Sequence, residues 1–298
     1  MRAMVLPAFG APLRLQTVPR PSIGPNDVLL RVRAAGVGLT VVIMTANPGR
    51  VTSFPRIPGH EVAGAVVEVG AEVTSVAVGA RVVCHFYLTC GACRFCRSGH
   101  ETLCTAFRGY VGQASDGGYA EYMAVPARNV TPIPSGVSDL DAAIASDAIA
   151  TPYHACREEA RVGPGDTVLI VGAGGGVGIH GVQVAKLCGG WVVGVDITDD
   201  KLDAAKAAGA DAIVDGRAGD LAAQGARSPA AAASTRRSTS SPRGRRWRLR
   251  WPRWRAPAAW SSSAAGPRPS SAWRRPSAWT PARCSPTCSR STARATSP

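Results

Sequence analysis

The chain has 298 residues, a formal net charge of +14 at pH 7 and 45% hydrophobic residues, a length that suggests two domains. Residues 225–298 hold 16 of the 34 Lys and Arg residues, six of the seven Trp and no acidic residue. Residues 1–224 therefore carry 18 basic and 20 acidic side chains, so the basic balance of the chain does not mark this region as a nucleic-acid-binding protein.

The compartment is predicted from the start of the chain and from its cysteines. No basic start followed by an unbroken apolar stretch lies near Met1, and no window reaches the roughly 18 apolar residues that a membrane span needs. We therefore expect a cytoplasmic protein without a membrane partner. In that compartment its nine cysteines indicate metal binding or catalysis before disulfides.

Residues 1–150 show short alternating apolar runs separated by Gly and Pro, for example 27–33, 63–69 and 80–83. This pattern is typical of a β-rich, barrel-like domain. Within it, Cys90, Cys93, Cys96 and Cys104 follow the spacing Cys-x2-Cys-x2-Cys-x7-Cys. Four thiolates complete a tetrahedral zinc shell and leave no position for substrate, so we predict a structural zinc site in a lobe over 84–108.

A second motif, Gly59-His60-Glu61-x2-Gly64-x5-Gly70, precedes the cysteines by about 30 residues. Together the two motifs resemble the zinc-type medium-chain alcohol dehydrogenase family, and the resemblance runs from Met1 to about Gln224. It implies an α/β protein with a GroES-like β-barrel catalytic domain over 1–150. It also implies a catalytic zinc bound by His60 with Glu61 in or near its shell, an alcohol or carbonyl substrate, and assembly into dimers or tetramers.

The sequence departs from this family where two further zinc ligands are expected. Gly38 takes the place of a ligand Cys, and Val41 takes the place of an Asp that orients the zinc-bound His, whereas Thr40 keeps the hydroxyl that passes the substrate proton. Asp147 falls on the position of the third ligand, and a carboxylate can bind zinc. Two interpretations stay open: a catalytic zinc held by His60, Asp147 and Glu61, or loss of that zinc, with Thr40, His60 and Asp147 handling the proton.

Residues 151–224 predict the first half of a Rossmann domain. Strands are expected at 166–171, 191–196 and 212–215, with helices at 179–187 and 200–208. The glycine-rich turn between the first strand and helix predicts pyrophosphate binding through six residues: Ala173, Gly174, Gly175, Gly176, Val177 and Gly178. Asp196 ends the second strand, where a carboxylate binds the ribose hydroxyls of NAD and repels the 2′-phosphate of NADP. The alternative role for Asp196 is a helix-capping acid.

Residues 225–298 contain no Lys, Asp, Glu, Val or Ile and lack the strands and helices that the family would place there. Residues 228–241 and 258–265 become family-like when their codons are shifted by one base, so we interpret 225–298 as a frameshifted, disordered tail that begins between about Gln224 and Ser228. A disordered basic tail and a nucleic-acid-binding arm, with Arg and Trp interleaved over 247–254, are the competing interpretations.

The resemblance implies an oxidoreductase that transfers hydride between an alcohol or carbonyl substrate and NAD. Activity and normal assembly of this chain are expected to be impaired, because the second half of the cofactor domain is scrambled. The alternatives are a zinc-independent quinone or enoyl-type reductase of the same superfamily, which Gly38, Val41 and Ala173 favour, and an inactive zinc-binding remnant. The sequence contains no indication of the particular substrate.

Overall fold

The computed structural model describes residues 1–46, 51 and 53–218. The chain divides into two units, Met1–Pro242 and Arg243–Pro298, and all described residues belong to the first. The predicted tail, residues 225–298, lies outside the described residues.

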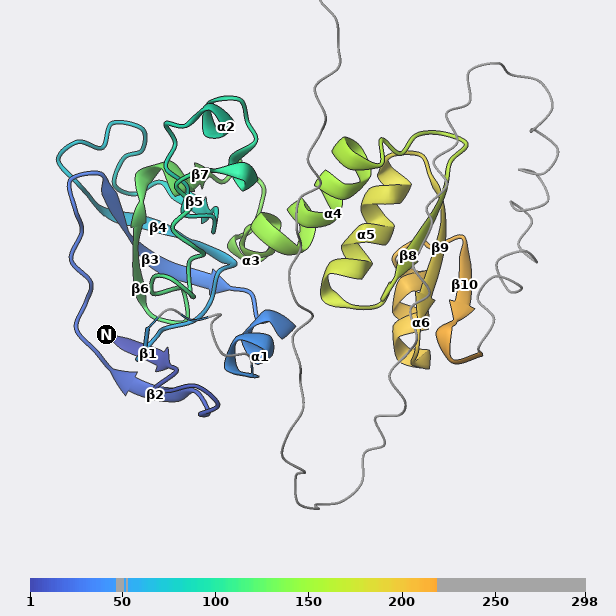
Figure 1. The fold of residues 1–298 in the computed structure, drawn as a ribbon, viewed down its shortest axis with the longest axis horizontal. Helices are drawn as coiled ribbons and strands as arrows, with labels where there is room; N and C mark the ends of the chain where they lie inside the picture. Colours follow the sequence, from blue (N-terminus) through green and yellow to red (C-terminus); the bar gives the residue numbers. More distant parts are fainter. Residues whose placement is uncertain (47–50, 52, 219–298) are drawn as a thin grey trace, which may run out of the picture. The chain divides into compact units, whose positions relative to one another are not determined.

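The N-terminal part is built on a five-stranded antiparallel sheet in the order β6-β3-β4-β5-β7, with a separate β1-β2 ribbon beside it (Figure 1). Its strands are β1 (Arg2–Val5), β2 (Arg14–Thr17), β3 (Asp27–Ala35), β4 (Val62–Val69), β5 (Arg81–Cys84), β6 (Tyr122–Pro126) and β7 (Val130–Pro132). The three strands predicted from alternating apolar runs are confirmed as β3, β4 and β5.

Alternating side chains of these strands fill one core. Val28, Leu30, Val66, Val82 and Met123 are at most 2% exposed and pack together across four strands. Complete burial of such a side chain contributes about 1.5–3 kcal/mol, so this cluster is the main stabilising element of the sheet.

Short helices connect and extend the sheet. They are α1 (Leu39–Ala46), α2 (Arg94–Arg97), η1 (Glu101–Leu103) and η2 (Ala127–Asn129). A longer helical segment follows β7 and consists of α3 (Asp139–Ile144), η3 (Ala145–Ile149), α4 (Ala150–His154) and η4 (Ala155–Glu159). Ser138 caps its start by accepting a hydrogen bond from the Asp141 N–H at 3.1 Å. The segments η3 and η4 are π-helical turns, which are rare and are frequently found at functional sites.

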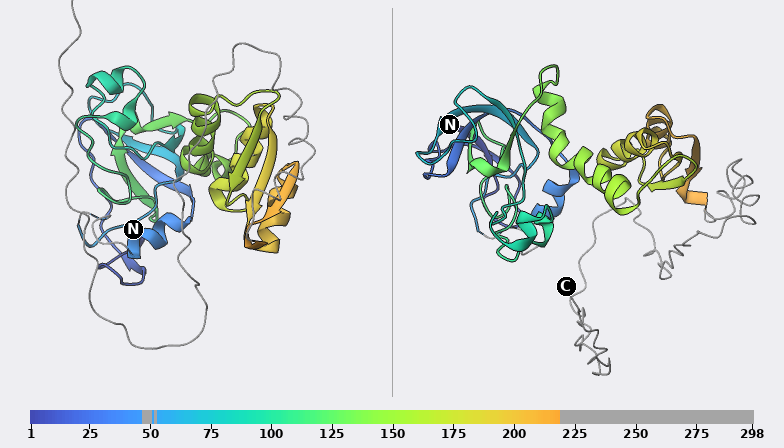
Figure 2. Two further views of the ribbon diagram at one scale, coloured as in Figure 1. Left: turned by 45° about the vertical axis from the view of Figure 1, so that its right-hand side comes forward. Right: turned by 90° about the horizontal axis from the view of Figure 1, so that it is seen from above.

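The following residues form a three-stranded parallel sheet in the order β10-β9-β8. Its elements are β8 (Thr167–Val171), α5 (Gly176–Leu187), β9 (Trp191–Asp196), α6 (Asp199–Ala207), β10 (Ala212–Asp215) and η5 (Gly216–Ala218), and Figure 2 shows both helices running along the strands. Val182 of α5 and Ala205 of α6 pack with Val192, so both helices cover one face. On the other face of β8, Leu169 and Val171 are 57% and 68% exposed.

The βαβαβ order agrees with the prediction, and the largest shift in a boundary is at the start of α5. Helix α5 begins at Gly176, three residues before the predicted start at Ile179, because the last glycines of the turn already adopt helical geometry. Gly175 is therefore the N-cap. Among the helices of the described residues, none is long and apolar enough to cross a membrane.

The close turn between β8 and α5 yields the first testable prediction. A Cβ on Gly178 would collide with the Gly172 carbonyl oxygen, whereas a Cβ on Gly176 would meet no atom within 4 Å. We expect Gly178→Ala to destabilise the parallel sheet by about 1–3 kcal/mol. The matched control Gly176→Ala should be neutral or slightly stabilising, because alanine favours the helix. Amide hydrogen exchange of β8 and β9 measures both effects, and equal exchange rates in the two variants would contradict the steric argument.

Candidate functional site

The four predicted cysteines converge on one point. The Sγ atoms of Cys90, Cys93, Cys96 and Cys104 all lie within 4.8 Å of one another, and those of Cys93 and Cys96 are 3.5 Å apart. Hydrogen bonds from the Cys96 and Thr105 backbone N–H groups lower the pKa of Cys93 to about 5. A preformed thiolate cluster of this size fits tetrahedral zinc, so these residues are the structural four-cysteine zinc site that the sequence predicted.

The predicted catalytic residues His60 and Asp147 lie in direct contact. His60 precedes β4 and is 8% exposed, and its Nε2 atom is 2.9 Å from Asp147 Oδ2. Asp147 belongs to the π-helical turn η3, and its other oxygen accepts a hydrogen bond from the Thr151 hydroxyl at 2.7 Å. The hydrogen bond with His60 is the main cause that holds the pKa of Asp147 below its usual range. The pair therefore couples an imidazole to an ionised carboxylate.

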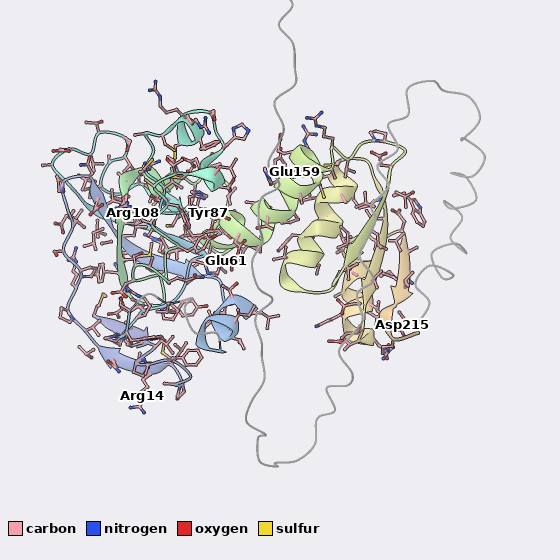
Figure 3. The ribbon with its side chains drawn as sticks, in the orientation of Figure 1. Arg14, Glu61, Tyr87, Arg108, Glu159 and Asp215 are labelled. Carbon is pink, nitrogen blue, oxygen red and sulfur yellow. The ribbon has the colours of Figure 1, made fainter. Side chains whose placement is uncertain are left out.

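Glu61, labelled in Figure 3, is buried, and its carboxylate accepts a hydrogen bond from the backbone. Its Oε1 atom accepts a hydrogen bond from the Ala148 N–H at 3.0 Å, and its carbonyl oxygen accepts one from the Gly36 N–H at 2.8 Å. Burial raises the pKa of Glu61 above its usual range, against the opposing effect of the Ala148 hydrogen bond. A Cβ on Gly36 would collide with the Glu61 carboxylate, so glycine is required there.

The described residues around His60 offer fewer zinc donors than a catalytic site usually has. Within the described residues, the cysteine cluster is the only group of three or more ligand atoms close enough to share an ion. A Cβ on Gly38 would meet no atom within 4 Å, so no neighbouring side chain fills the position of the family's ligand Cys. His60 and Asp147 offer two donors, one fewer than the three protein ligands usual for catalytic zinc.

One cavity of about 770 Å³ brings most of the predicted residues together. Thr40, His60, Glu61, Asp147, Gly175, Gly176, Val177, Gly178 and Asp196 all line it. Two of the predicted cofactor-binding residues are not among its lining residues: Ala173 is completely buried in the core of the parallel sheet, and Gly174 packs against the Lys201 backbone. The acid–base pair and most of the glycine turn therefore face one space.

The carboxylate of Asp196 connects the end of β9 to the glycine turn. Its Oδ2 accepts a hydrogen bond from the Gly174 N–H at 2.9 Å, and its Oδ1 accepts one from the Ile197 N–H at 2.8 Å. Each carboxylate oxygen has a second lone pair, so both can still accept from ribose hydroxyls. The first turn of α5 adds N–H groups without a helical acceptor, the usual setting for a phosphate.

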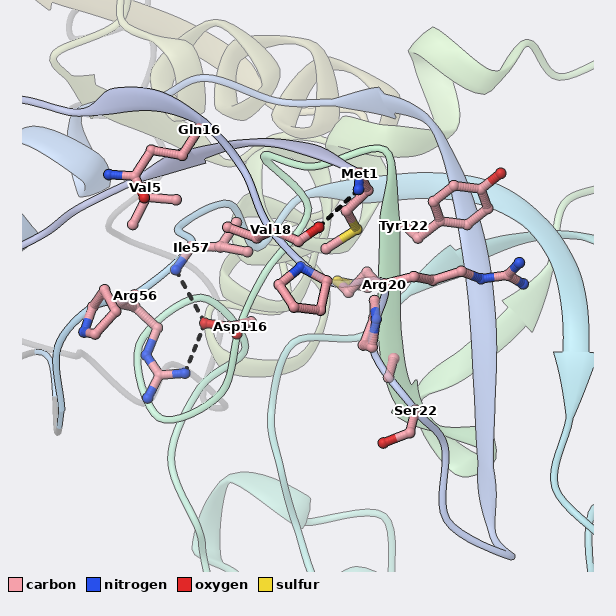
Figure 4. Close-up of a pocket in the computed structure, with 15 residues that line it drawn as sticks. Met1, Val5, Gln16, Val18, Arg20, Ser22, Arg56, Ile57, Asp116 and Tyr122 are labelled. Atoms are coloured by element: carbon pink, nitrogen blue, oxygen red, sulfur yellow. Dashed lines mark hydrogen bonds and ion pairs between the residues drawn. The ribbon is translucent and has the colours of Figure 1, made fainter.

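A second cavity, of about 480 Å³, lies beside the β1-β2 ribbon (Figure 4). An ion pair at 2.9 Å between Arg56 and Asp116 lies at its edge, and Asp116 also accepts a hydrogen bond from the Ile57 N–H at 3.0 Å. None of the predicted site residues lines it. We therefore place the candidate active site in the larger cavity.

Sequence reasoning missed two contributors to the site. His180 of α5 lines the larger cavity, and the Phe86 ring lies 5.0 Å from the His60 ring. A lone His within a helix and a Phe within an apolar run carry no local signal of such a role. Their proximity to the site depends on contacts between distant segments.

Comparisons with known proteins agree with this arrangement. The family model described as "Alcohol dehydrogenase GroES-like domain" matches residues 24–135, and the one described as "Zinc-binding dehydrogenase" matches residues 176–228. An alcohol dehydrogenase from Geobacillus stearothermophilus is 41% identical over 224 residues, which cover 74% of this chain and 66% of that protein. The chain thus spans slightly less than two thirds of the length of the curated relatives it matches.

Solved structures show the same similarity. One described as an NAD-dependent alcohol dehydrogenase is 35% identical with a TM-score of 0.70, over 76% of this chain and 67% of that chain. A thermostable alcohol dehydrogenase from Pyrobaculum aerophilum, solved with cobalt and zinc bound, is 37% identical with a TM-score of 0.67, over 72% and 64%. With its four-cysteine zinc site, GroES-like sheet and Rossmann-type βαβαβ unit, the chain belongs to the zinc-containing medium-chain alcohol dehydrogenase family, by homology over residues 24 to about 228.

Proposed function

We propose that the described residues form the catalytic part and the first cofactor-binding half of an oxidoreductase that transfers hydride between an alcohol or carbonyl carbon and a nicotinamide. The observation that carries the proposal is that one cavity is lined both by the His60–Asp147 pair and by the glycine turn with Asp196. A reacting carbon in that cavity would have an acid–base group and a dinucleotide site within the same space.

In this proposal His60 handles the proton. Asp147 holds the His60 ring through the hydrogen bond at Nε2, and Thr151 holds Asp147 in place. The Thr40 hydroxyl lines the same cavity and can pass the substrate O–H proton. A nicotinamide bound at the glycine turn would accept the hydride, so oxidation of an alcohol would leave one proton on the protein and no net charge on the carbonyl product.

The chain's zinc chemistry is proposed to be structural. Four thiolates suit the lobe site, whereas the described residues around His60 form no three-ligand group. The same observation favours the second candidate function, a zinc-independent quinone or enoyl-type reductase, which also depends on hydride transfer. Substrates separate the two: the first candidate oxidises alcohols, whereas the second reduces quinones or activated double bonds.

The remaining parts of the proposal concern domains and location. We propose domain limits at 1–150 and 151–224, with 225–298 as the frameshifted tail, and note that the matched family region ends at residue 228. Dimer or tetramer assembly of the parent protein, impaired assembly of this chain and a cytoplasmic location stay predictions.

The metal content of the chain tests the zinc assignment. We expect one zinc per chain by elemental analysis, and loss of that zinc in Cys93→Ser, because three thiolates no longer complete the shell. The matched control Cys188→Ser removes a thiol outside the cluster and should keep the zinc. Two zinc ions per chain would contradict the structural-only assignment and restore the catalytic zinc.

Cofactor preference tests the role of Asp196. We expect NADH to bind about tenfold more tightly than NADPH, a difference of about 1.4 kcal/mol, because the carboxylate repels the 2′-phosphate. Asp196→Asn should reduce this ratio, while the control Asp203→Asn on the exposed face of α6 should keep it. Calorimetry measures both affinities, and an unchanged ratio in Asp196→Asn would rule out the assigned role.

Turnover tests the function itself. We expect the chain as printed to show little dehydrogenase activity, and a gene with one base added or removed near codons 224–228 to encode an active enzyme. In that enzyme, Asp147→Asn should lower kcat/KM by about 10²–10⁴-fold, because His60 loses its charged partner.

The matched control for turnover is Glu159→Gln, which changes an exposed carboxylate 3.1 Å from His154. It should keep full activity. Spectrophotometric assays with alcohols, aldehydes, quinones and enones measure all variants. Ordinary activity in the chain as printed would overturn the frameshift interpretation, and equal activity in Asp147→Asn would overturn the catalytic assignment.

A further inference from the structure

Within the predicted lobe, residues 89–107 form a loop that two antiparallel segments, 85–88 and 108–111, close at its base, and from here on the zinc lobe means residues 89–107. Tyr87 and Tyr110 form a bridge between the segments. Three backbone hydrogen bonds of 2.9 Å join them: Leu88 N–H to Gly109 O, Arg108 N–H to Leu88 O and Val111 N–H to Phe86 O. We call these two segments the neck of the lobe.

The neck carries a continuous cluster of aromatic rings. The ring centroids of Phe86 and Tyr87 are 4.8 Å apart, those of Tyr87 and Tyr110 are 5.0 Å apart, and those of Tyr110 and Phe107 are 4.9 Å apart. These separations lie in the range in which aromatic pairs attract each other. The four rings therefore form one packed unit, the neck aromatics.

The neck aromatics reach the candidate active site. The Phe86 and His60 rings pack edge to face, with centroids 5.0 Å apart and planes inclined at 69°. Asp147, the partner of His60, also acts on Tyr87: burial is the largest cause that raises the pKa of Tyr87, and the negative charge of Asp147 adds to it. The imidazole is thus held by Asp147 through Nε2 and by Phe86 through its ring.

The cysteine cluster is directly connected to the neck. Cys90 lies two residues after Leu88, Cys104 lies four residues before Arg108, and the Cys90 N–H is 3.3 Å from Cys104 Sγ. A metal that joins these cysteines closes the loop immediately above the neck. Without the metal, only the hydrogen bonds of the neck oppose the loss of chain entropy that closing the loop requires.

The other side of the neck is held independently of the lobe. Asn129 is buried, and its side-chain N–H group donates hydrogen bonds to the carbonyl oxygens of His85 at 2.6 Å and Tyr87 at 2.8 Å. This clamp fixes the backbone of 85–87, so the lobe can act on His60 only through the orientation of the Phe86 ring, which lies against the Tyr110 ring with centroids 5.8 Å apart. In the other segment Val111 is buried in the core of the sheet. Phe107 and Tyr110 lie between Val111 and the cysteines in the sequence, so their rings are the part that depends on the metal.

We propose that zinc in the lobe positions His60 through the neck aromatics, with Phe86 as the positioning residue. The lobe zinc then determines the orientation of an active-site imidazole as well as the local stability of the lobe. The proposal rests on the proposed function only in taking His60 as a reacting residue. Its tests use no turnover, so they succeed or fail separately from the proposed function.

The first test compares two cysteine variants of the full chain by NMR. With His and Phe rings isotopically labelled and zinc kept constant, the wild-type protein should show a cross-peak between the His60 and Phe86 rings. We expect the cross-peak to weaken or disappear in Cys93→Ser and to persist in the control Cys188→Ser. A cross-peak of wild-type intensity in Cys93→Ser, with elemental analysis showing the lobe zinc lost, would overturn the proposal.

The second test keeps all four cysteines, so it still tests the proposal if Cys93→Ser fails to fold. Tyr110→Ala removes the ring that links Tyr87 to Phe107. Because coupling between two sites is reciprocal in binding free energy, disruption of the neck should weaken the metal site, and we expect the zinc affinity, measured by equilibrium competition with a chelator, to fall about tenfold. Phe86→Tyr keeps the ring and should bind zinc with the wild-type affinity. Equal zinc affinities for Tyr110→Ala and wild type would also overturn the proposal.

Discussion

Two adjacent buried side chains, His60 and Glu61, carry the connections on which the arrangement of the site depends. His60 bonds to Asp147, and Glu61 accepts from the N–H of the next residue, Ala148, each across 87 positions of sequence. A pair of neighbours before β4 is thereby joined to a pair of neighbours in the π-helical turn η3. A buried carboxylate without such a partner would cost free energy of folding. These bonds therefore fix the position of the turn against the sheet.

These bonds also separate the properties of two nearby carboxyl groups. Burial raises the pKa of Glu61, whereas the hydrogen bond with His60 lowers that of Asp147. Carboxyl groups whose environments move their pKa values in opposite directions are well suited to different tasks at one site. Here Asp147 is the ionised partner of the imidazole, and Glu61 accepts a hydrogen bond from the Ala148 backbone N–H.

The two zinc sites that the family resemblance implies draw their ligands from different parts of the chain. The four cysteines lie within 15 residues, so one loop can bring their sulfur atoms together. A catalytic site needs donors from three separate segments, and the segment that holds Gly38 contributes none. The loop site is therefore complete, and the cavity contains an imidazole–carboxylate pair.

The sequence by itself determined three strands of the antiparallel sheet, the βαβαβ order and the zinc cluster. Alternating apolar residues predicted the strands, glycine and the following acid predicted the dinucleotide turn, and cysteine spacing predicted the zinc cluster, because each signal lies within a short segment. Only the tertiary structure decided that Asp147 meets His60, that Glu61 faces Ala148 and that Phe86 lies against the imidazole. Those contacts join segments distant in sequence, and their geometry follows from the packing of the sheet and helices, which no local pattern encodes.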